Sequence, residues 1–258
     1  MRYMLTSLLI LGCSGVMMAA ELKTKVVEYE YQGTKLKGFM VYENVDAKRP
    51  GVLIVHEWWG LNDYAKMRAE MLAKLGYVAF CVDMYGDGKT TEHPKEAGEF
   101  AGKVRENLEV WRGRAEAGLK TFQAQPQVDA TKIAAIGYCF GGSTALQLAY
   151  TGADLKAVGT FHAALPIPTE AEAKAIKCPL MICHGADDSF IPEQVINSFK
   201  GKVTDAKVKL DFIAYPGAKH SFTVKGVDAK GVNGLAYNAD ADEKSWKSLQ
   251  ELLKTTLK

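Results

Sequence analysis

Cys139 lies in a short segment whose residue types suit nucleophilic chemistry. The segment reads Gly-Tyr-Cys-Phe-Gly-Gly at residues 137–142, after an apolar run typical of a buried strand and before a stretch of helical pattern. Small residues two positions before and after the nucleophile, here Gly137 and Gly141, permit the sharp strand-to-helix turn called a nucleophile elbow. At a helix N-terminus the Cys139 thiolate is favoured, and the following N–H, on Phe140, is directed at a developing oxyanion. A glycine-rich turn that carries a buried core cysteine is the alternative interpretation.

Acidic and histidine residues follow two later predicted strands. Asp187 and Asp188 come after the strand predicted at 179–183, and His220 comes after the strand predicted at 208–215. Nucleophile, acid and histidine in this chain order are typical of the α/β-hydrolases. Because the carboxyl ends of parallel strands meet at one edge of a sheet, this order predicts that the three groups lie together there.

The elements that position these residues alternate between strand and helix. Two β-rich segments, 24–31 and 34–42, are joined by Gln32 and Gly33 and predict an antiparallel hairpin. Further strands are expected at 51–56, 77–84, 132–138, 155–161, 179–183 and 208–215, and helices at 63–75, 94–125, 142–150, 192–200 and 239–257. Glycines at positions 98, 102, 113 and 118 are expected to divide the longest helical stretch into two. The pattern predicts an α/β fold of the α/β-hydrolase type, with an eight-stranded, mainly parallel sheet, an antiparallel start and helices on both faces.

Length and composition limit the classes of protein. The 258 residues are 48% hydrophobic and 24% charged, which excludes a disordered, collagen-like or coiled-coil chain. Lys and Arg number 32 against 30 Asp and Glu, and the net charge of +2 is too small for the broad basic face that nucleic-acid binding needs. Because no linker or internal repeat interrupts the pattern, residues 21–258 are expected to form one domain without a stable membrane span.

The first 20 residues have the order of a secretory signal peptide. A basic residue precedes the mostly apolar run 4–18, and two alanines precede the polar residues from Glu21 onward, so cleavage is expected after Ala20. A weak lipobox ending at Cys13 is the alternative, and lipidation there is ranked lower because Leu11 occupies a position usually held by a small residue. The sequence contains no Asn-x-Ser/Thr, and the expected location is a bacterial periplasm or the secreted fraction.

The remaining cysteines and histidines favour neither disulfides nor a metal site. Cys81 lies within a predicted strand, and Cys178 and Cys183 are five residues apart on one strand, so all three are interpreted as core residues. The chain lacks the paired Cys and His spacings that indicate zinc, and no metal or cofactor is expected. Structural or site-lining roles are expected for the other histidines, His56, His93, His162 and His184. Of these, His162 ends a predicted strand and is expected to line the pocket.

From residue 21 to 258 the sequence resembles the dienelactone hydrolase family, a branch of the α/β-hydrolases with a cysteine nucleophile. The resemblance is carried by Asn44–Gly60, Asp83-Met84-Tyr85, the cysteine elbow, Gly185–Pro192 and His220-Ser221-Phe222. It implies that Cys139 is the nucleophile, that His220 is the general base and then the general acid, and that an aspartate orients the imidazole. Asp188 is chosen for this role because the family's acid is followed three and four residues later by an aliphatic residue and proline. Asp187 is the second choice.

The resemblance also assigns roles to the segment His-Glu-Trp-Trp-Gly at 56–60, which follows the third predicted strand. In the family, the glutamate of such a segment approaches the resting thiol and helps to control its ionisation, which implies this role for Glu57. The α/β-hydrolases take a second oxyanion-hole N–H from this loop, so Trp58 is expected to supply it beside Phe140. Trp59 is interpreted as core packing or as a wall of the substrate site.

The expected reaction is hydrolysis of a small-molecule ester, lactone or thioester through a thioester acyl-enzyme. A thiolate leaves a tetrahedral intermediate more readily than an alkoxide, so substrates with good leaving groups are expected. The two arginines with which dienelactone hydrolase binds its substrate carboxylate are replaced here by Asp87 and Val224. Lys89 and Lys225 substitute for them only if the loops differ, and lysine lacks the bidentate grip of arginine. The loop 86–96 is expected to shape the pocket, and the enzyme is expected to be a monomer.

Two other functions remain as alternatives. A secreted binding protein on a degenerate hydrolase fold would show neither thiol reactivity at Cys139 nor ester turnover. A thiol redox or peroxide-sensing protein would form a stable sulfenate or a disulfide at Cys139, although the sequence places no resolving cysteine near it. The hydrolase is ranked first, the binding protein second and the redox protein third.

Overall fold

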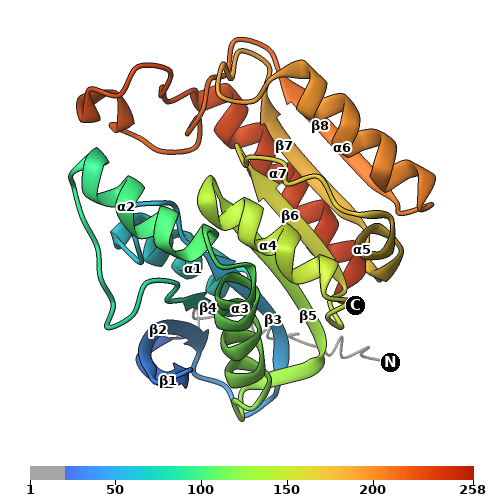
Figure 1. Cartoon of the computed structure of the whole chain (residues 1–258). Coiled ribbons are helices and arrows are strands. Elements are labelled where there is room, and N and C mark those ends of the chain that lie inside the picture. The colour runs from blue at the N-terminus through green and yellow to red at the C-terminus, as the bar shows by residue number, and fades with distance from the viewer. Residues whose placement is uncertain (1–20) are drawn as a thin grey trace, which may run out of the picture.

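The predicted strands form one continuous eight-stranded sheet (Figure 1). The computed structural model describes residues 21–258. Its strands are β1 (Leu22–Tyr31), β2 (Thr34–Glu43), β3 (Arg49–Val55), β4 (Val78–Val82), β5 (Val128–Tyr138), β6 (Ala157–Phe161), β7 (Leu180–Gly185) and β8 (Leu210–Tyr215). They lie in the order β1-β2-β4-β3-β5-β6-β7-β8. The pairs β1–β2 and β2–β4 are antiparallel and all the others are parallel, which confirms the predicted mainly parallel sheet with an antiparallel start.

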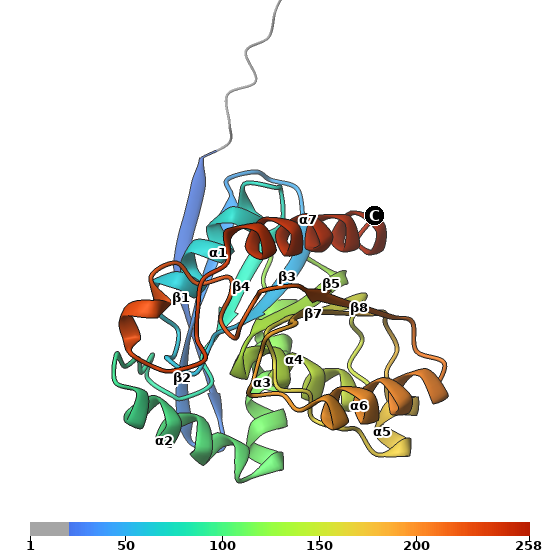
Figure 2. The ribbon, with the colours of Figure 1, turned by 90° about the horizontal axis from the view of Figure 1, so that it is seen from above.

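Helices cover both faces of this sheet. They are α1 (Asp63–Ala73), α2 (Pro94–Arg105), α3 (Leu108–Gln123), α4 (Phe140–Tyr150), α5 (Glu170–Ala175), α6 (Glu193–Asp205) and α7 (Ala239–Thr256), with a 3-10 turn η1 (Val227–Lys230). One face is covered by α1 and α7 and the other by α2 to α6 (Figure 2). In β3, Val52 and Ile54 pack into the core under α1 and α7, and Leu53 and Val55 pack into the opposite core. Since side chains alternate along a strand, a strand buried on both faces requires the uninterrupted apolar run seen here.

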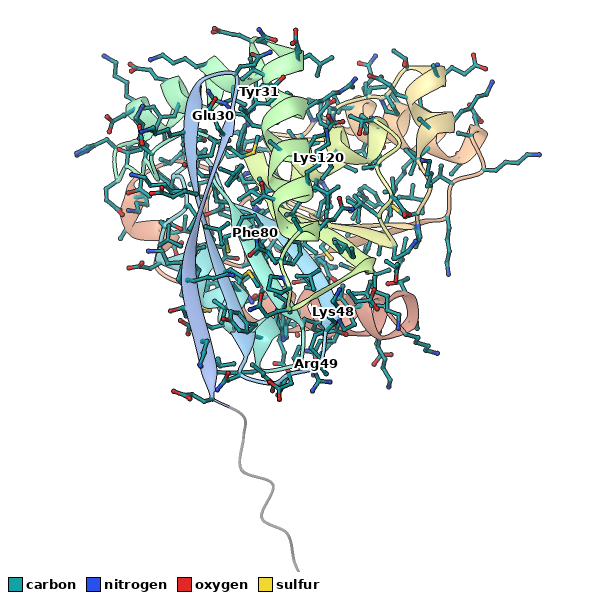
Figure 3. The ribbon with its side chains drawn as sticks, turned by 90° about the horizontal axis from the view of Figure 1, so that it is seen from below. Glu30, Tyr31, Lys48, Arg49, Phe80 and Lys120 are labelled. Carbon is teal, nitrogen blue, oxygen red and sulfur yellow. The ribbon has the colours of Figure 1, made fainter. Side chains whose placement is uncertain are left out.

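The antiparallel hairpin connects the edge of the sheet to a helix. Gln32 and Gly33 form its turn with positive φ angles of 46° and 75°, as a tight hairpin turn requires. At this end of the hairpin, Tyr31 lies beside α3, and its hydroxyl donates to the Glu109 carbonyl at 3.3 Å (Figure 3). The hairpin is therefore held both by the β2–β4 pairing and by a contact with α3.

The break between α2 and α3 corrects one prediction. It falls at Asn107, whose side chain caps α3 by accepting from the N–H of Val110 at 3.2 Å. The four glycines expected to break the helix all lie inside α2 or α3. A Cβ on Gly113 would lie 2.0 Å from the Tyr31 ring. This glycine is retained because a neighbour packs directly on the helix backbone, and the local sequence does not reveal that tertiary contact.

Two further boundaries differ from the expected pattern. The short helix α5 is not predicted, although Thr169 and Glu172 form a capping box at its start. Helix α4 begins at Phe140 rather than at residue 142.

The predicted signal peptide, residues 1–20, and the alternative lipidation site at Cys13 lie outside the described residues. Over residues 21–258, none of the helices has the length and apolar character needed to cross a membrane.

Candidate active site

Cys139 lies at a strained turn between β5 and α4. Its φ and ψ are 52° and −115°, a conformation that costs energy in a residue with a side chain. A Cβ on Gly137 would lie 2.1 Å from the carbonyl oxygen of Gly141, and a Cβ on Gly141 would lie 2.1 Å from that of Val55. Both glycines are therefore required by the backbone, as the elbow interpretation of the sequence predicts.

The structure brings His220 and Asp188 to the same edge of the sheet as Cys139. They follow β8 and β7, and the Nδ1–H of His220 donates to Oδ2 of Asp188 at 2.8 Å. The Asp188 side chain is fully buried, whereas Asp187 is exposed to solvent. Burial lowers the pKa of His220, but the neighbouring Cys139 and the Asp188 carboxylate outweigh burial and raise this pKa to about 10. The arrangement therefore favours the imidazolium form of His220 at neutral pH.

Glu57 is buried in the loop that follows β3. Its Oε1 accepts from the hydroxyl of Ser221 at 3.1 Å, and its Oε2 has no hydrogen-bond partner among the described residues. Burial raises the pKa of Glu57 to about 7, although His220, the Ser221 hydrogen bond and Arg68 each act to lower it. Within residues 21–258, Glu57 forms no hydrogen bond with Cys139. The sequence does not single out Ser221, which has a positive φ of 57° and follows His220 directly.

The two residues expected to supply oxyanion-hole N–H groups are Phe140, directly after Cys139, and Trp58, in the loop after β3. Phe140 is the first residue of α4, so its N–H has no partner within the helix. Trp58 is partly buried and lines the pocket, and its carbonyl accepts from the Tyr85 hydroxyl at 3.0 Å. Trp59 is 3% exposed and packs against Trp58 with 4.8 Å between ring centroids, which agrees with a packing role.

His56 has a structural role in the same loop. Its two ring nitrogens bond to the Glu57 carbonyl at 2.6 Å and to the Met84 N–H at 3.2 Å. Since the carbonyl only accepts and the N–H only donates, the imidazole is neutral with its proton on Nδ1. Burial lowers the pKa of His56, which agrees with the neutral form.

A pocket of about 250 Å³ opens over Cys139. Its lining is mostly apolar and comprises Trp58, Arg105, Cys139, Ala164, Phe190, Ile191, His220, Val232 and Leu235. Arg105, in the last turn of α2, is the one charged side chain of this lining apart from the histidine, and its guanidinium lies 5.2 Å from the Phe140 ring centroid. Sequence reasoning misses Arg105, because a basic residue at the end of a charged helix is typical of a solvated surface.

The lysines and the loop expected at the pocket lie elsewhere. Lys89 lines a neighbouring pocket of about 290 Å³, and Lys225 lies 5.8 Å from the Tyr237 ring. None of the residues 86–96 lines the Cys139 pocket, and the loop contributes to its shape through Glu92, which pairs with Lys230 of the segment that forms one pocket wall. Asp87, at one of the family's arginine positions, is 3.6 Å from Lys37 in an exposed ion pair.

One wall of the pocket comes from the segment between β8 and α7. This segment, 226–238, brings Val232 and Leu235 over the site. It is held by an ion pair between Lys230 and Glu92 and by the N–H of Ala236, which donates to the His220 carbonyl at 3.1 Å. In Figure 1 this segment is the orange-red loop that lies above α2.

His162 does not line the pocket, contrary to the sequence expectation. It is fully buried behind His220, with 5.3 Å between the two ring centroids. Burial, followed by the charges of His220 and Arg68, lowers its pKa well below the usual value. Cys139, His162 and Ser221 all have positive φ angles, and strained non-glycine residues of this kind concentrate at functional sites.

The other cysteines of residues 21–258, Cys81, Cys178 and Cys183, are buried and free. Cys178 and Cys183 belong to the cores on opposite faces of the sheet, as predicted, although Cys178 precedes β7. Burial raises the pKa of each of these two thiols to about 12, so neither is a thiolate at neutral pH. In the part of the chain that the structure describes, no three His, Cys, Asp or Glu side chains are grouped to hold a metal ion.

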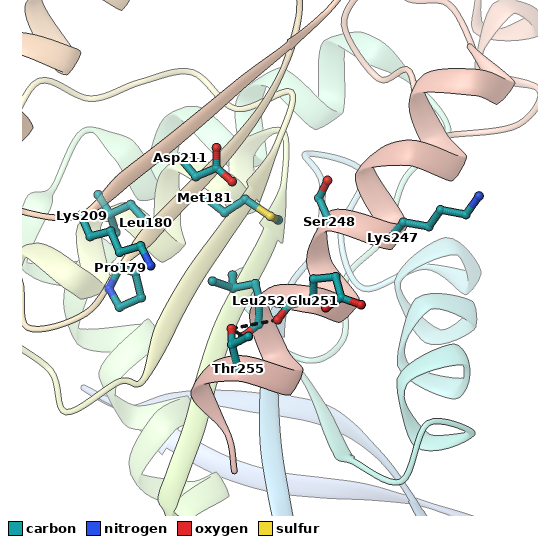
Figure 4. Close-up of a pocket in the computed structure, with 10 residues that line it drawn as sticks. All are labelled: Pro179, Leu180, Met181, Lys209, Asp211, Lys247, Ser248, Glu251, Leu252 and Thr255. Carbon is teal, nitrogen blue, oxygen red and sulfur yellow. Dashed lines mark hydrogen bonds between the residues drawn. The ribbon is translucent and has the colours of Figure 1, made fainter.

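A larger pocket, of about 430 Å³, lies at the opposite end of the sheet (Figure 4). It is formed between α7 and the amino ends of β7 and β8, and Pro179, Lys209 and Ser248 are among its lining residues. No cysteine or histidine lines it. In sheets of this type, ligands bind at the carboxyl ends of the strands, where the Cys139 pocket lies and this larger pocket does not.

The eight-stranded sheet, the elbow after β5, and the acid and histidine after β7 and β8 define an α/β-hydrolase. The sequence profile of the Dienelactone hydrolase family matches residues 37–257, and the chain belongs to this family. It is therefore an enzyme that hydrolyses esters or lactones.

Individual relatives agree with this assignment. A putative carboxymethylenebutenolidase of Synechocystis is 28% identical over 260 residues, which cover 93% of this chain and 100% of the relative. The carboxymethylenebutenolidase of Pseudomonas putida is 28% identical over 195 residues, with 72% and 80% covered. Among solved structures, m3DLH has a TM-score of 0.89 at 36% identity and covers 92% of this chain and 99% of its own. A dienelactone hydrolase-like promiscuous phosphotriesterase from metagenomic libraries has a TM-score of 0.89 at 35% identity, with the same coverage.

Proposed function

We propose that the protein hydrolyses carboxylic esters, lactones or thioesters through a Cys139–His220–Asp188 triad. The observation that carries this proposal is the imidazole of His220, which lies beside Cys139 in the pocket and bonds to the buried Asp188 at 2.8 Å. A cysteine on a strained elbow with such an imidazole has the geometry of an activated nucleophile.

The first half of the reaction forms an acyl-enzyme. The Cys139 thiolate, whose proton is on His220, forms a bond to the acyl carbon. The N–H groups of Phe140 and Trp58 stabilise the oxyanion, and each such donor contributes about 10²–10³ in rate. The bond to the leaving oxygen or sulfur then breaks, and that atom takes the proton from the His220 imidazolium.

The second half of the reaction releases the acid. The neutral imidazole of His220 accepts a proton from water as the water oxygen attacks the thioester carbonyl. The carbon–sulfur bond breaks, Cys139 leaves as the thiolate, and the carboxylic acid product departs. Because the thiolate is a better leaving group than an alkoxide, substrates with activated leaving groups are preferred in the first half.

Glu57 is proposed to control the ionisation of the resting thiol. Its carboxyl lies next to the residue that follows His220, and burial holds its pKa at about 7. A carboxyl with this pKa exchanges its proton near neutral pH. A change in the charge of Glu57 alters the stability of the His220 imidazolium, and through it that of the Cys139 thiolate.

Arg105 is proposed to select substrates that carry an anionic group. The pocket combines apolar walls with this one cation, and no carboxylate is among its lining residues. Arg105 forms no ion pair with the other residues of the described chain. A small acyl compound with an apolar body and a carboxylate fits this lining better than a neutral one.

The enzyme is further proposed to be exported, with residues 1–20 removed as a signal peptide and lipidation at Cys13 as the second possibility. Expression of the full sequence in a Gram-negative host, followed by fractionation and N-terminal sequencing, tests this. A periplasmic protein that begins at Glu21 is the expected result, and an uncleaved cytoplasmic protein is the contrary one.

Acyl trapping on Cys139 tests the proposed chemistry. After brief exposure to p-nitrophenyl acetate, mass spectrometry should show an acetyl group on Cys139 that disappears within further turnovers. Cys139→Ala should lose ester turnover, whereas Cys178→Ala, which removes a buried thiol away from the pocket, should retain it. No acylation and no turnover would favour the binding-protein alternative, and a stable sulfenate or disulfide without acylation would favour the redox alternative.

A further inference from the structure

Arg68, a buried arginine on α1, is linked to the active site by hydrogen bonds although it does not line the Cys139 pocket. It is 3% exposed. Its Nε donates to the Tyr64 hydroxyl at 3.2 Å, and a terminal nitrogen donates to the Thr223 carbonyl at 3.0 Å and pairs with Asp242. The guanidinium also lies 5.6 Å from the Tyr138 ring centroid. Its position is therefore fixed by contacts on several sides.

A chain of side-chain contacts continues from Tyr64 to Glu57. The Tyr64 hydroxyl is 2.6 Å from Oγ1 of Thr223, and that same Oγ1 is 2.8 Å from Nε2 of His162. Nδ1 on the other side of the imidazole is 3.9 Å from Oε1 of Glu57. Neither Nδ1 of His162 nor Oε2 of Glu57 has a hydrogen-bond partner among the described residues. The unpartnered Nδ1 of His162 therefore lies near a carboxyl group whose Oε1 is bonded to Ser221 and whose Oε2 has no partner among the described residues.

The arginine favours one direction for the hydrogen bonds in this chain. A guanidinium only donates, so the Tyr64 oxygen accepts from Arg68 and its own proton is free for Thr223. Burial raises the pKa of Tyr64 well above its usual value, so the phenol keeps that proton. Thr223 then accepts from Tyr64 and gives its hydroxyl proton to Nε2 of His162. Since the buried imidazole is neutral, its single proton must be on Nδ1.

We propose that Arg68 and Tyr64 are positioning residues that, through Thr223, fix the proton of His162 on Nδ1, where it faces the Glu57 carboxylate. The functional consequence rests on the proposed role of Glu57 in thiol activation. With Nδ1 protonated, the imidazole turns a positive dipole end toward the carboxylate and favours its ionised form. The other tautomer would place the Nδ1 lone pair next to the carboxylate and would disfavour its ionised form.

Several groups act on Glu57 from the elements packed around it. The loop after β8 contributes His220 and the Ser221 hydroxyl, β6 leads into His162, and α1 contributes Arg68 and Tyr64. If the chain is interrupted at Tyr64 or Thr223, the effects of His220 and Ser221 remain and only the orientation of the His162 proton is lost. The expected result is an upward shift in the pH at which Glu57 ionises.

Imidazole NMR on the folded enzyme tests the tautomer directly. Two-bond ¹H–¹⁵N correlation spectra of protein labelled with ¹⁵N-histidine distinguish Nδ1–H from Nε2–H, and His162→Gln identifies the His162 signal. The wild-type enzyme should show the Nδ1–H form. Thr223→Val and Tyr64→Phe should show a mixture of tautomers or the Nε2–H form. An Nε2–H or doubly protonated His162 in the wild-type enzyme overturns the proposal, whether or not the variants fold.

Matched controls come from two buried residues outside the chain. Thr160→Val removes a buried hydroxyl that has no partner among the described residues, and Tyr150→Phe removes one that donates to the Pro166 carbonyl at 2.7 Å. Both should keep the wild-type His162 signal. A change in the controls equal to that in the chain variants would show a general packing effect and would overturn the proposed role.

The pH dependence of Cys139 alkylation by iodoacetamide gives the second readout. In Thr223→Val and Tyr64→Phe, the midpoint assigned to Glu57 should move upward by about half a pH unit, because at 3.9 Å the Nδ1–H dipole acts more weakly than a hydrogen bond to a charged group. An unchanged midpoint together with an unchanged tautomer refutes the positioning role. The tautomer does not depend on turnover, so an Nδ1–H signal in an enzyme without esterase activity refutes the proposed function alone.

Discussion

Replacement of Asp188 by Asn tests the proposed triad at its most defined contact. One oxygen of the fully buried carboxylate accepts from His220 at 2.8 Å, and the other accepts from the N–H of Phe190 at 3.0 Å. In Asp188→Asn the amide oxygen is the only acceptor for Phe190, so the NH₂ group is left facing the imidazole. His220 must then accept at Nδ1 and hold its proton on Nε2, which is the wrong tautomer for a general base.

The expected loss follows from the tautomer of the imidazole. An Asp-to-Asn change in a triad of this kind lowers the rate by up to about 10⁴, so kcat/KM should fall by about 10²–10⁴. The carboxylate also helps to raise the pKa of His220 to about 10. Its removal lowers this pKa, so the imidazolium that stabilises the thiolate is lost at a lower pH. Alkylation of Cys139 at neutral pH should therefore also slow.

The neighbouring aspartate provides the matched control. Asp187 is exposed, and Asp187→Asn removes the same charge without touching the imidazole. Both variants are assayed with p-nitrophenyl acetate and with iodoacetamide, and thermal unfolding verifies that each is folded. The reasoning is refuted if Asp188→Asn stays within about threefold of the wild-type kcat/KM or if Asp187→Asn loses as much activity as Asp188→Asn.

Two further predictions concern the buried carboxyl and the pocket cation. Because the pKa of Glu57 rises from 4.5 to about 7 on folding, ionising it destabilises the folded state by at most about 3 kcal/mol. This penalty is absent below pH 4.5, grows as the pH rises to about 7 and is constant above that. Urea unfolding should therefore show that Glu57→Gln stabilises the protein at pH 8 but not at pH 4. Equal effects at both pH values would contradict the burial argument. Arg105→Ala should raise KM about tenfold for an ester that carries a carboxylate and leave KM for a neutral ester unchanged. Lys89→Ala removes a lysine of the neighbouring pocket and should change neither KM value. If Arg105→Ala raises KM for both esters, Arg105 has a packing role instead.

The sequence by itself determined the sheet and the position of the cysteine elbow. Uninterrupted apolar runs such as Val52–Val55 identify strands buried on both faces, and their alternation with helical stretches permits few topologies. The elbow at Cys139 is equally local, because Gly137 and Gly141 are required by the backbone of the turn itself. The loops that carry Asp188 and His220 follow from strand order, because the carboxyl ends of parallel strands share one edge.

Only the tertiary structure decided which charged and polar groups surround the site. The sequence analysis singles out neither Arg105 nor Arg68, yet one lines the pocket and the other is 3% exposed. Likewise, Gly113 remains inside α3 because Tyr31 packs on it from a distant strand. The local sequence pattern reflects which backbone conformation a residue prefers. Burial and hydrogen-bond direction depend instead on side chains that come from other parts of the chain. The chain of contacts from Arg68 through Tyr64 and Thr223 to His162 is the clearest case.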